Sequence, residues 1–149
     1  MKPALVLGFL LMLSGAGVHA QSPANQGFAV VVKPNSSYKS IGDLVRDGVG
    51  PSKGRLNCGI AQRAPNSAGA AACGALDQRT GMTNMVVPYK DYNGMLSDLL
   101  ASQVDIGIVP IGIAAGLAAD GKVRVLVVST GAGPSPIQGV PTLAEAGYK

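Results

Sequence analysis

An α/β fold, with a mostly parallel sheet and flanking helices, is predicted by three features of this sequence. Short segments rich in β-branched residues alternate along the chain with segments of helical character, which is typical of βαβ units. The strand segments, such as FAVVVK and VRVLVVS, are almost continuously apolar, which indicates a sheet covered on both faces. Clusters of Gly, Pro, Asn and Ser separate the segments and predict the turns.

The expected elements follow one another in regular alternation. Strands are expected at residues 28–33, 56–60, 84–87, 104–109 and 123–129. Helices are expected at residues 41–47, in the alanine-rich segment that ends near Thr80, at residues 93–102 and at residues 113–120. We find no internal repeat and no low-complexity segment.

Three helix starts carry capping signals. Ser40 is followed three residues later by Asp43, an arrangement close to a capping box. Asn93 can cap the third helix. Thr142 and Glu145 form a T-x-x-E pattern, which predicts another short helix near the end of the chain.

The first twenty residues have the layout of a secretory signal peptide. Lys2 precedes an apolar run at residues 4–13, and Val18 and Ala20 fit a cleavage site after Ala20. The run is too short to span a bilayer, and no Cys follows the site to carry a lipid. We therefore expect a signal peptide at residues 1–20, a short linker at 21–27, a single domain at 28–149, and a periplasmic product without a membrane span.

The charge pattern argues against nucleic acid as a partner. The formal net charge is +4, the basic residues form no run, and aromatic residues make up only 4% of the chain. Nucleic-acid binding requires a basic stripe or a stacking platform, and neither is present in the sequence.

Two cysteines, Cys58 and Cys73, leave two interpretations open. A protein exported to an oxidising compartment could join them in a disulfide. They fall on an expected strand and inside the next expected helix, where both would be buried as small apolar side chains. Because disulfide geometry is restrictive, we favour the reduced pair.

Sequence motifs of catalysis and cofactor binding are missing. The only histidine, His19, lies in the signal segment, so no Ser–His or Cys–His nucleophile is available. No phosphate-binding loop is present, and Pro136 interrupts the G-x-G that begins at Gly131. Asp98 and Asp105, the closest plausible acidic pair, are interpreted as structural. We expect a binding protein without enzymatic activity, cofactor or metal.

The junctions between strands and helices are either ordinary loops of an α/β protein, which the fold class alone favours, or binding sites. In open α/β sheets, ligands lie beyond the carboxyl ends of the strands, where helix N-termini point. Residues 62–67, 89–94 and 109–112 form three such junctions. Unpaired N–H groups and the positive end of the helix dipole would favour a carboxylate there.

Four stretches resemble the receptors of tripartite tricarboxylate transporters, the Bug or TctC family of periplasmic solute-binding proteins. They are FAVVVKPNSSYKSIGDL at residues 28–44, VPYKDYNGMLSDLLASQVD at 87–105, GKVRVLVVST at 121–130 and GVPTLAEAGY at 139–148. Their order and spacing match the family over nearly all of the chain after the signal segment.

The resemblance implies one lobe of a two-lobed, type II periplasmic binding protein. It further implies small organic acids as ligands and a membrane permease as a candidate partner. The chain corresponds to the second lobe, with the first largely missing, so ligand binding is expected to be weak or lost. The alternative is a protein-interaction module, or a non-functional remnant, that binds no solute.

The resemblance carries five candidate ligand-binding residues onto this chain. Tyr89 and Lys90 match the V-P-Y-K element that lines the family's cleft, and Ala61 matches a loop that touches ligand through its backbone. Asn66 and Ser67 lie near the start of the next helix. Three departures weaken the match: residues 60–66 replace the usual S-A-G-x-G-T loop, Val109 stands where an Asp is common, and Asp91 replaces a Gly.

Overall fold

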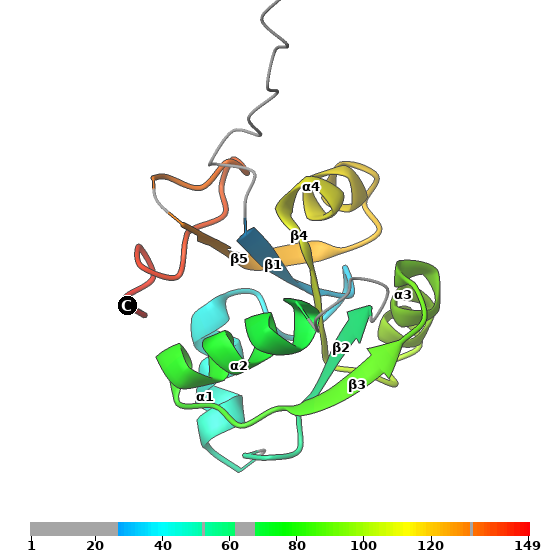
Figure 1. The fold of residues 1–149 in the computed structure, drawn as a ribbon, viewed down its shortest axis with the longest axis horizontal. Helices are drawn as coiled ribbons and strands as arrows, with labels where there is room; N and C mark the ends of the chain where they lie inside the picture. The colour runs from blue at the N-terminus through cyan, green and yellow to red at the C-terminus, as the bar shows by residue number, and fades with distance from the viewer. Residues whose placement is uncertain (1–26, 52, 62–67, 132) are drawn as a thin grey trace, which may run out of the picture.

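Five strands and four helices form the part of the chain that the structure describes (Figure 1). This structure is a computed structural model, and it describes residues 27–51, 53–61, 68–131 and 133–149. In chain order the elements are β1 (Gly27–Val32), α1 (Ile41–Val49), β2 (Asn57–Ala61), α2 (Ala68–Thr80), β3 (Met85–Tyr89), α3 (Tyr92–Leu100), β4 (Ile106–Pro110), α4 (Ile111–Ala119) and β5 (Arg124–Thr130). Each predicted strand and each of the four predicted helices up to residue 120 is confirmed, with ends that shift by a few residues. The expected signal peptide, and all but the last residue of the expected linker, lie outside the described residues.

The five strands form one sheet in the order β3-β2-β4-β1-β5. β2 pairs in parallel with both β3 and β4, whereas β1 pairs antiparallel with both β4 and β5. β2, β3, β4 and β5 therefore point the same way, and β1 alone runs against them. The prediction of a mostly parallel sheet is confirmed for these four strands. The carboxyl ends of the four strands share one edge of the sheet with the beginning of β1.

Helices cover both faces of the sheet, as the continuous apolar strands predict. α1 and α2 pack with one set of strand side chains, and α3 and α4 pack with the other. Alternation along β1 illustrates the division, since Val30 and Val32 join the first core and Ala29 and Val31 join the second. All four side chains are fully buried. Burial of this apolar surface is the main force that holds the layers together.

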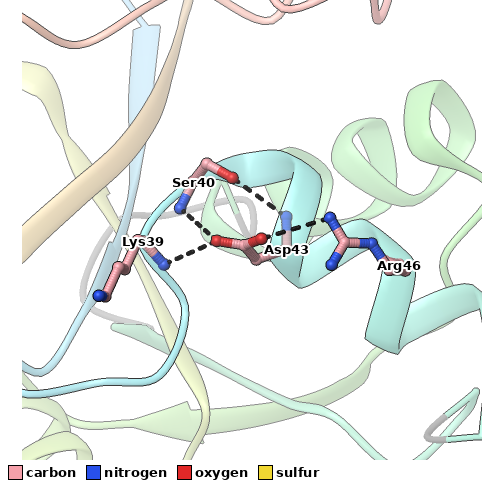
Figure 2. A network of polar contacts seen from close by, with 4 residues as sticks. All are labelled: Lys39, Ser40, Asp43 and Arg46. Atoms are coloured by element: carbon pink, nitrogen blue, oxygen red, sulfur yellow. Dashed lines mark hydrogen bonds and ion pairs between the residues drawn. The ribbon is translucent and has the colours of Figure 1, made fainter.

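The start of α1 forms the predicted capping box (Figure 2). The Asp43 N–H donates to the Ser40 hydroxyl at 3.2 Å, and the Ser40 N–H donates to the Asp43 carboxylate at 3.1 Å. The Lys39 N–H donates to the same carboxylate at 3.1 Å, and Arg46 lies 3.4 Å away as an exposed ion pair. These contacts satisfy N–H groups that the first helical turn leaves unpaired.

The cap of α3 differs from the prediction. The N-cap is Asp91 rather than Asn93, and its carboxylate accepts the Gly94 N–H at 2.9 Å. Both side chains can cap a helix. Asp91 has the extended backbone of a cap, whereas Asn93 already lies within the first helical turn.

The predicted helix at Thr142 is a turn in the structure. Thr142 and Glu145 do exchange the two expected hydrogen bonds, at 3.0 and 3.1 Å. The segment is, however, held against β5, because the Leu143 N–H donates to the Val128 carbonyl at 2.9 Å. Gly147 then takes a φ of +94°, so the chain leaves the helical path after a single turn.

Candidate functional site

A hollow of about 330 Å³ opens at the sheet edge where the parallel strands end. Its lining comes from the beginning of β1, the ends of β2 and β4, the first two turns of α2 and the start of α3. The described lining residues are Gly27, Phe28, Ala61, Ala68, Gly69, Ala72, Tyr92, Ile108, Val109 and Pro110. This is the edge at which ligands bind in open α/β sheets, and the sequence predicts the site there.

Two glycines of the lining allow close approach of neighbouring segments beside the hollow. A Cβ atom at Gly69 would lie 2.8 Å from the Ile60 Cβ, so the first turn of α2 can rest on β2 only without a side chain there. Gly27 has a φ of +137°, and a Cβ atom there would lie 1.9 Å from the Ser129 carbonyl oxygen. Glycine at residue 27 therefore permits the pairing of β1 with the end of β5.

Tyr92 supplies the polar side chain of the described lining. Its hydroxyl makes no hydrogen bond to the part of the chain that the structure describes. Burial raises the pKa of the Tyr92 hydroxyl above its ordinary value, so the group stays protonated at neutral pH and can donate a hydrogen bond to an anion.

The start of α4 lies at the same hollow. Pro110, which lines the hollow, is the N-cap of α4 and provides no side-chain cap. The first N–H groups of α4 consequently lack a side-chain partner, and the positive end of the helix dipole lies with them. The arrangement suits a small anionic group that is attached to an apolar body.

The five residues carried over from the resemblance are not all brought together. Ala61 ends β2 and lines the hollow. Tyr89 lies at the end of the neighbouring strand β3 and is not part of the described lining. Lys90 follows it with its side chain exposed. Asn66 and Ser67 lie outside the described residues.

The Tyr89 hydroxyl has a partner within the protein. It donates to the Asp98 carboxylate at 2.7 Å. Burial, together with the bond to this carboxylate, raises the pKa of Tyr89 to about 12. Asp105 likewise accepts the Asn57 N–H, at 2.7 Å. Both carboxylates therefore have hydrogen-bond partners within the protein, which agrees with the structural interpretation of Asp98 and Asp105.

The two cysteines are free and buried in the structure. Cys58 on β2 and Cys73 in α2 belong to the same core. The Cys73 thiol and burial raise the pKa of the Cys58 thiol, so Cys58 is not a reactive thiolate. Among the described residues, no group of three or more His, Cys, Asp or Glu side chains could hold a metal ion.

Several lining residues were not predicted individually. Tyr92 and Pro110 fall within two of the three expected junctions, so their position in the sequence was a usable signal. Phe28 offered no such signal, because it reaches the hollow only through the antiparallel pairing of β1, which places Phe28 opposite Pro110. Ala72 lies one helical turn inside α2, where sequence alone indicates an ordinary packing position.

Solved structures with the same fold include a periplasmic binding protein and two proteins solved with a carboxylate. The Rpa4515 protein of R. palustris, solved with adipate, is 28% identical with a TM-score of 0.70. MatC of Rhodopseudomonas palustris, solved with malate, is 23% identical with a TM-score of 0.68. The periplasmic binding protein BugD is 23% identical with a TM-score of 0.65. Each comparison covers 82% of this chain and 40% of the other chain.

The chain therefore spans about 40% of the length of these structures. No curated protein matches it. The model of the tripartite tricarboxylate transporter family receptor, TctC, matches residues 20–149, which include every described element. Such receptors are binding proteins of transport systems rather than enzymes. Because the family model matches residues 20–149, the chain belongs to the tripartite tricarboxylate transporter receptor family.

Proposed function

We propose that this chain is a solute-binding lobe for small carboxylates, acting outside the cytoplasm, and that it binds weakly by itself. The observation that carries the proposal is the edge hollow, in which Tyr92 and Pro110, the N-cap of α4, line an otherwise apolar wall of described residues. Relatives support the ligand class, because Rpa4515 was solved with adipate and MatC with malate.

In this proposal residues 28–149 correspond to the second lobe of a two-lobed receptor. Ala61 would meet the ligand through its backbone at the end of β2. Tyr89 and Lys90 would lie at the rim of the site, with Asn66 and Ser67 on the junction before α2. The ligand would remain partly exposed to water, unlike a solute enclosed between two lobes.

A titration followed by amide NMR tests the proposal. Acetate, succinate, adipate and malate are added in turn to the isotope-labelled protein. We expect saturable shifts at Gly69, Tyr92 and Val109, which line the hollow, and none at Asp43 in α1. Absence of saturable shifts with every carboxylate would instead support a protein-interaction module or a remnant that binds no solute.

Export is the second part of the proposal. Lys2, the apolar run and Ala20 support a signal peptide that is cleaved after Ala20, and solved relatives are described as periplasmic. Among the described residues, no helix has the length and apolar character needed to cross a membrane. A membrane permease would then receive the solute.

Intact-mass analysis of the exported protein tests this part. We expect a product that begins at Gln21. A periplasmic product that retains Lys2 and the apolar run would contradict cleavage.

A further inference from the structure

We propose that Pro88 prevents the free edge of the sheet from pairing with a second copy of this chain. The surface concerned is the outer side of β3, the last strand of the sheet, which is hydrogen-bonded to β2 alone among the described strands (Figure 1). An edge of this kind accepts another strand unless a feature of the sequence opposes it. The inference concerns association of the protein and does not depend on the carboxylate site.

The backbone groups of β3 alternate between the two sides of the strand. The Met85 N–H donates to the Leu56 carbonyl at 2.8 Å, and β3 runs parallel to β2. Because every second residue of a parallel strand bonds to the same neighbour, Met85 and Val87 face β2. Val86 and Pro88 therefore direct their backbone groups to the free edge.

The side chains of this edge favour association. Met85 is 56% exposed and Val86 is 44% exposed, which is unusual for large apolar side chains. Residues 84–89 carry no charged side chain. Proteins protect exposed edges with charged side chains, proline or other devices, and proline is confined to edge strands or bulges within sheets. In β3 the protection comes from Pro88.

A second copy of the chain would match this edge in an antiparallel register with a two-fold axis at Val86. Each Val86 would then donate its N–H to the carbonyl of Val86 in the other copy. Met85 of each copy would lie opposite Val87 of the other, so the exposed Met85 side chain would be covered. The apolar surface is thus self-complementary in this register.

Pro88 removes the hydrogen bonds that would extend this pairing. The next pair that faces the free edge is Asn84 opposite Pro88 of the other copy. Pro88 has no N–H to donate, and the Asn84 N–H already donates to the Asp77 carboxylate at 2.9 Å. The Asn84 carbonyl would lose water without gaining a donor, which is unfavourable. Symmetry repeats this loss on the other side of the axis, so only the two bonds at Val86 remain.

Sedimentation equilibrium of the purified protein and its variants tests the inference. We expect the unsubstituted protein to be monomeric. Pro88→Val supplies two symmetric N–H donors to the dimer, so self-association should strengthen about fivefold to hundredfold. Pro136→Val changes an exposed proline outside the sheet, and this matched control should leave association unchanged. Equal association of the unsubstituted protein and Pro88→Val would overturn the inference.

A charge at the two-fold axis tests the register. Combining Pro88→Val with Val86→Lys places two ammonium groups opposite each other, which should restore the monomer because like charges at such a pair repel. A dimer that persists in the combined variant would contradict pairing through Val86. A dimer of the unsubstituted protein that Val86→Lys dissociates would also contradict the inference, because the edge would then pair despite Pro88.

Amide hydrogen exchange of the unsubstituted protein keeps the inference testable if Pro88→Val does not fold. The Val86 N–H faces the free edge, whereas the Val87 N–H bonds to β2. Val86 should therefore exchange roughly a hundredfold faster than Val87. Equal protection of the two amides would show that another segment already covers the edge, and the role of Pro88 would be refuted.

Discussion

Tyr92 and the two cysteines are the side chains for which single substitutions or chemical probes give the most direct tests. Tyr92 lines the hollow, its hydroxyl makes no hydrogen bond to the described residues, and burial raises its pKa. Such a donor is available to an acceptor that enters the hollow.

We therefore expect Tyr92→Phe to weaken carboxylate binding by about twofold to tenfold, the value of one net hydrogen bond. The stability of the protein should change little, because the hydroxyl makes no hydrogen bond to the described residues in the free protein. The affinity is measured by NMR titration and the stability by urea unfolding. Tyr148→Phe, which is not part of the described lining, is the matched control. An unchanged affinity in Tyr92→Phe would contradict the role.

Cys58 and Cys73 are expected to stay reduced after export. Both thiols are fully buried between β2 and α2, and the raised pKa of Cys58 keeps the thiolate population low. Thiol counting in denaturant without reductant should find two free thiols per chain, and the folded protein should react slowly. A monomer with no free thiol would refute the expectation.

At the scale of single elements, the capping box of α1 gives the clearest energetic expectation. Ser40→Ala removes the hydroxyl that accepts the Asp43 N–H and should lower the free energy of unfolding by about 0.5–2 kcal/mol. Lys39→Ala is the control, since Lys39 contributes to this network through its backbone N–H. In urea unfolding, Ser40→Ala should therefore lower the free energy of unfolding more than Lys39→Ala does. The difference between the two variants is the contribution of the cap, apart from any general effect of a surface substitution.

The Asp43 carboxylate also predicts how stability depends on pH. Hydrogen bonds from the Lys39 N–H and from Ser40, with Arg46 nearby, lower the pKa of Asp43. The ionised form is therefore favoured by folding, so its contribution is fully present above the unfolded pKa of about 4 and is lost as pH falls through the lower folded value. Asp43→Asn should flatten the stability profile below about pH 4. If the unsubstituted protein and Asp43→Asn showed the same dependence of unfolding free energy on pH, the role of the Asp43 carboxylate would be disproved.

At the scale of the whole molecule, the open hollow limits affinity. A charge near a helix dipole contributes about 0.3–1 kcal/mol, and each net hydrogen bond contributes about 0.5–1.5 kcal/mol. Association costs at least about 4 kcal/mol, so a few such contacts barely offset it. We expect this chain alone to bind small carboxylates with millimolar or weaker affinity, as measured by calorimetry. Micromolar binding by a monomer would contradict this, and micromolar binding by a dimer would indicate that a second copy completes the site.

The residues of the hollow that the sequence could predict are those in the junctions that follow the expected strands. Junction residues such as Tyr92 and Pro110 could be placed at the ligand edge, because parallel strands bring their carboxyl ends together. Tyr89 could not be placed securely, because its pairing with Asp98 depends on how α3 lies against β3. Phe28 could not be found at all without the strand order.

By itself, the sequence determined the alternation of strands and helices, the burial of the sheet on both faces, the capping box at Ser40 and the resemblance to the receptor family. Each of these is written in residues close together in the chain or in motifs of fixed spacing. Only the tertiary structure decided the reversed direction of β1, the turn at Thr142 and the meeting of Phe28, Ala61 and Tyr92 around one hollow. The physical reason is that local periodicity records which face a residue buries, whereas strand order and direction are settled by pairing between segments far apart in the sequence.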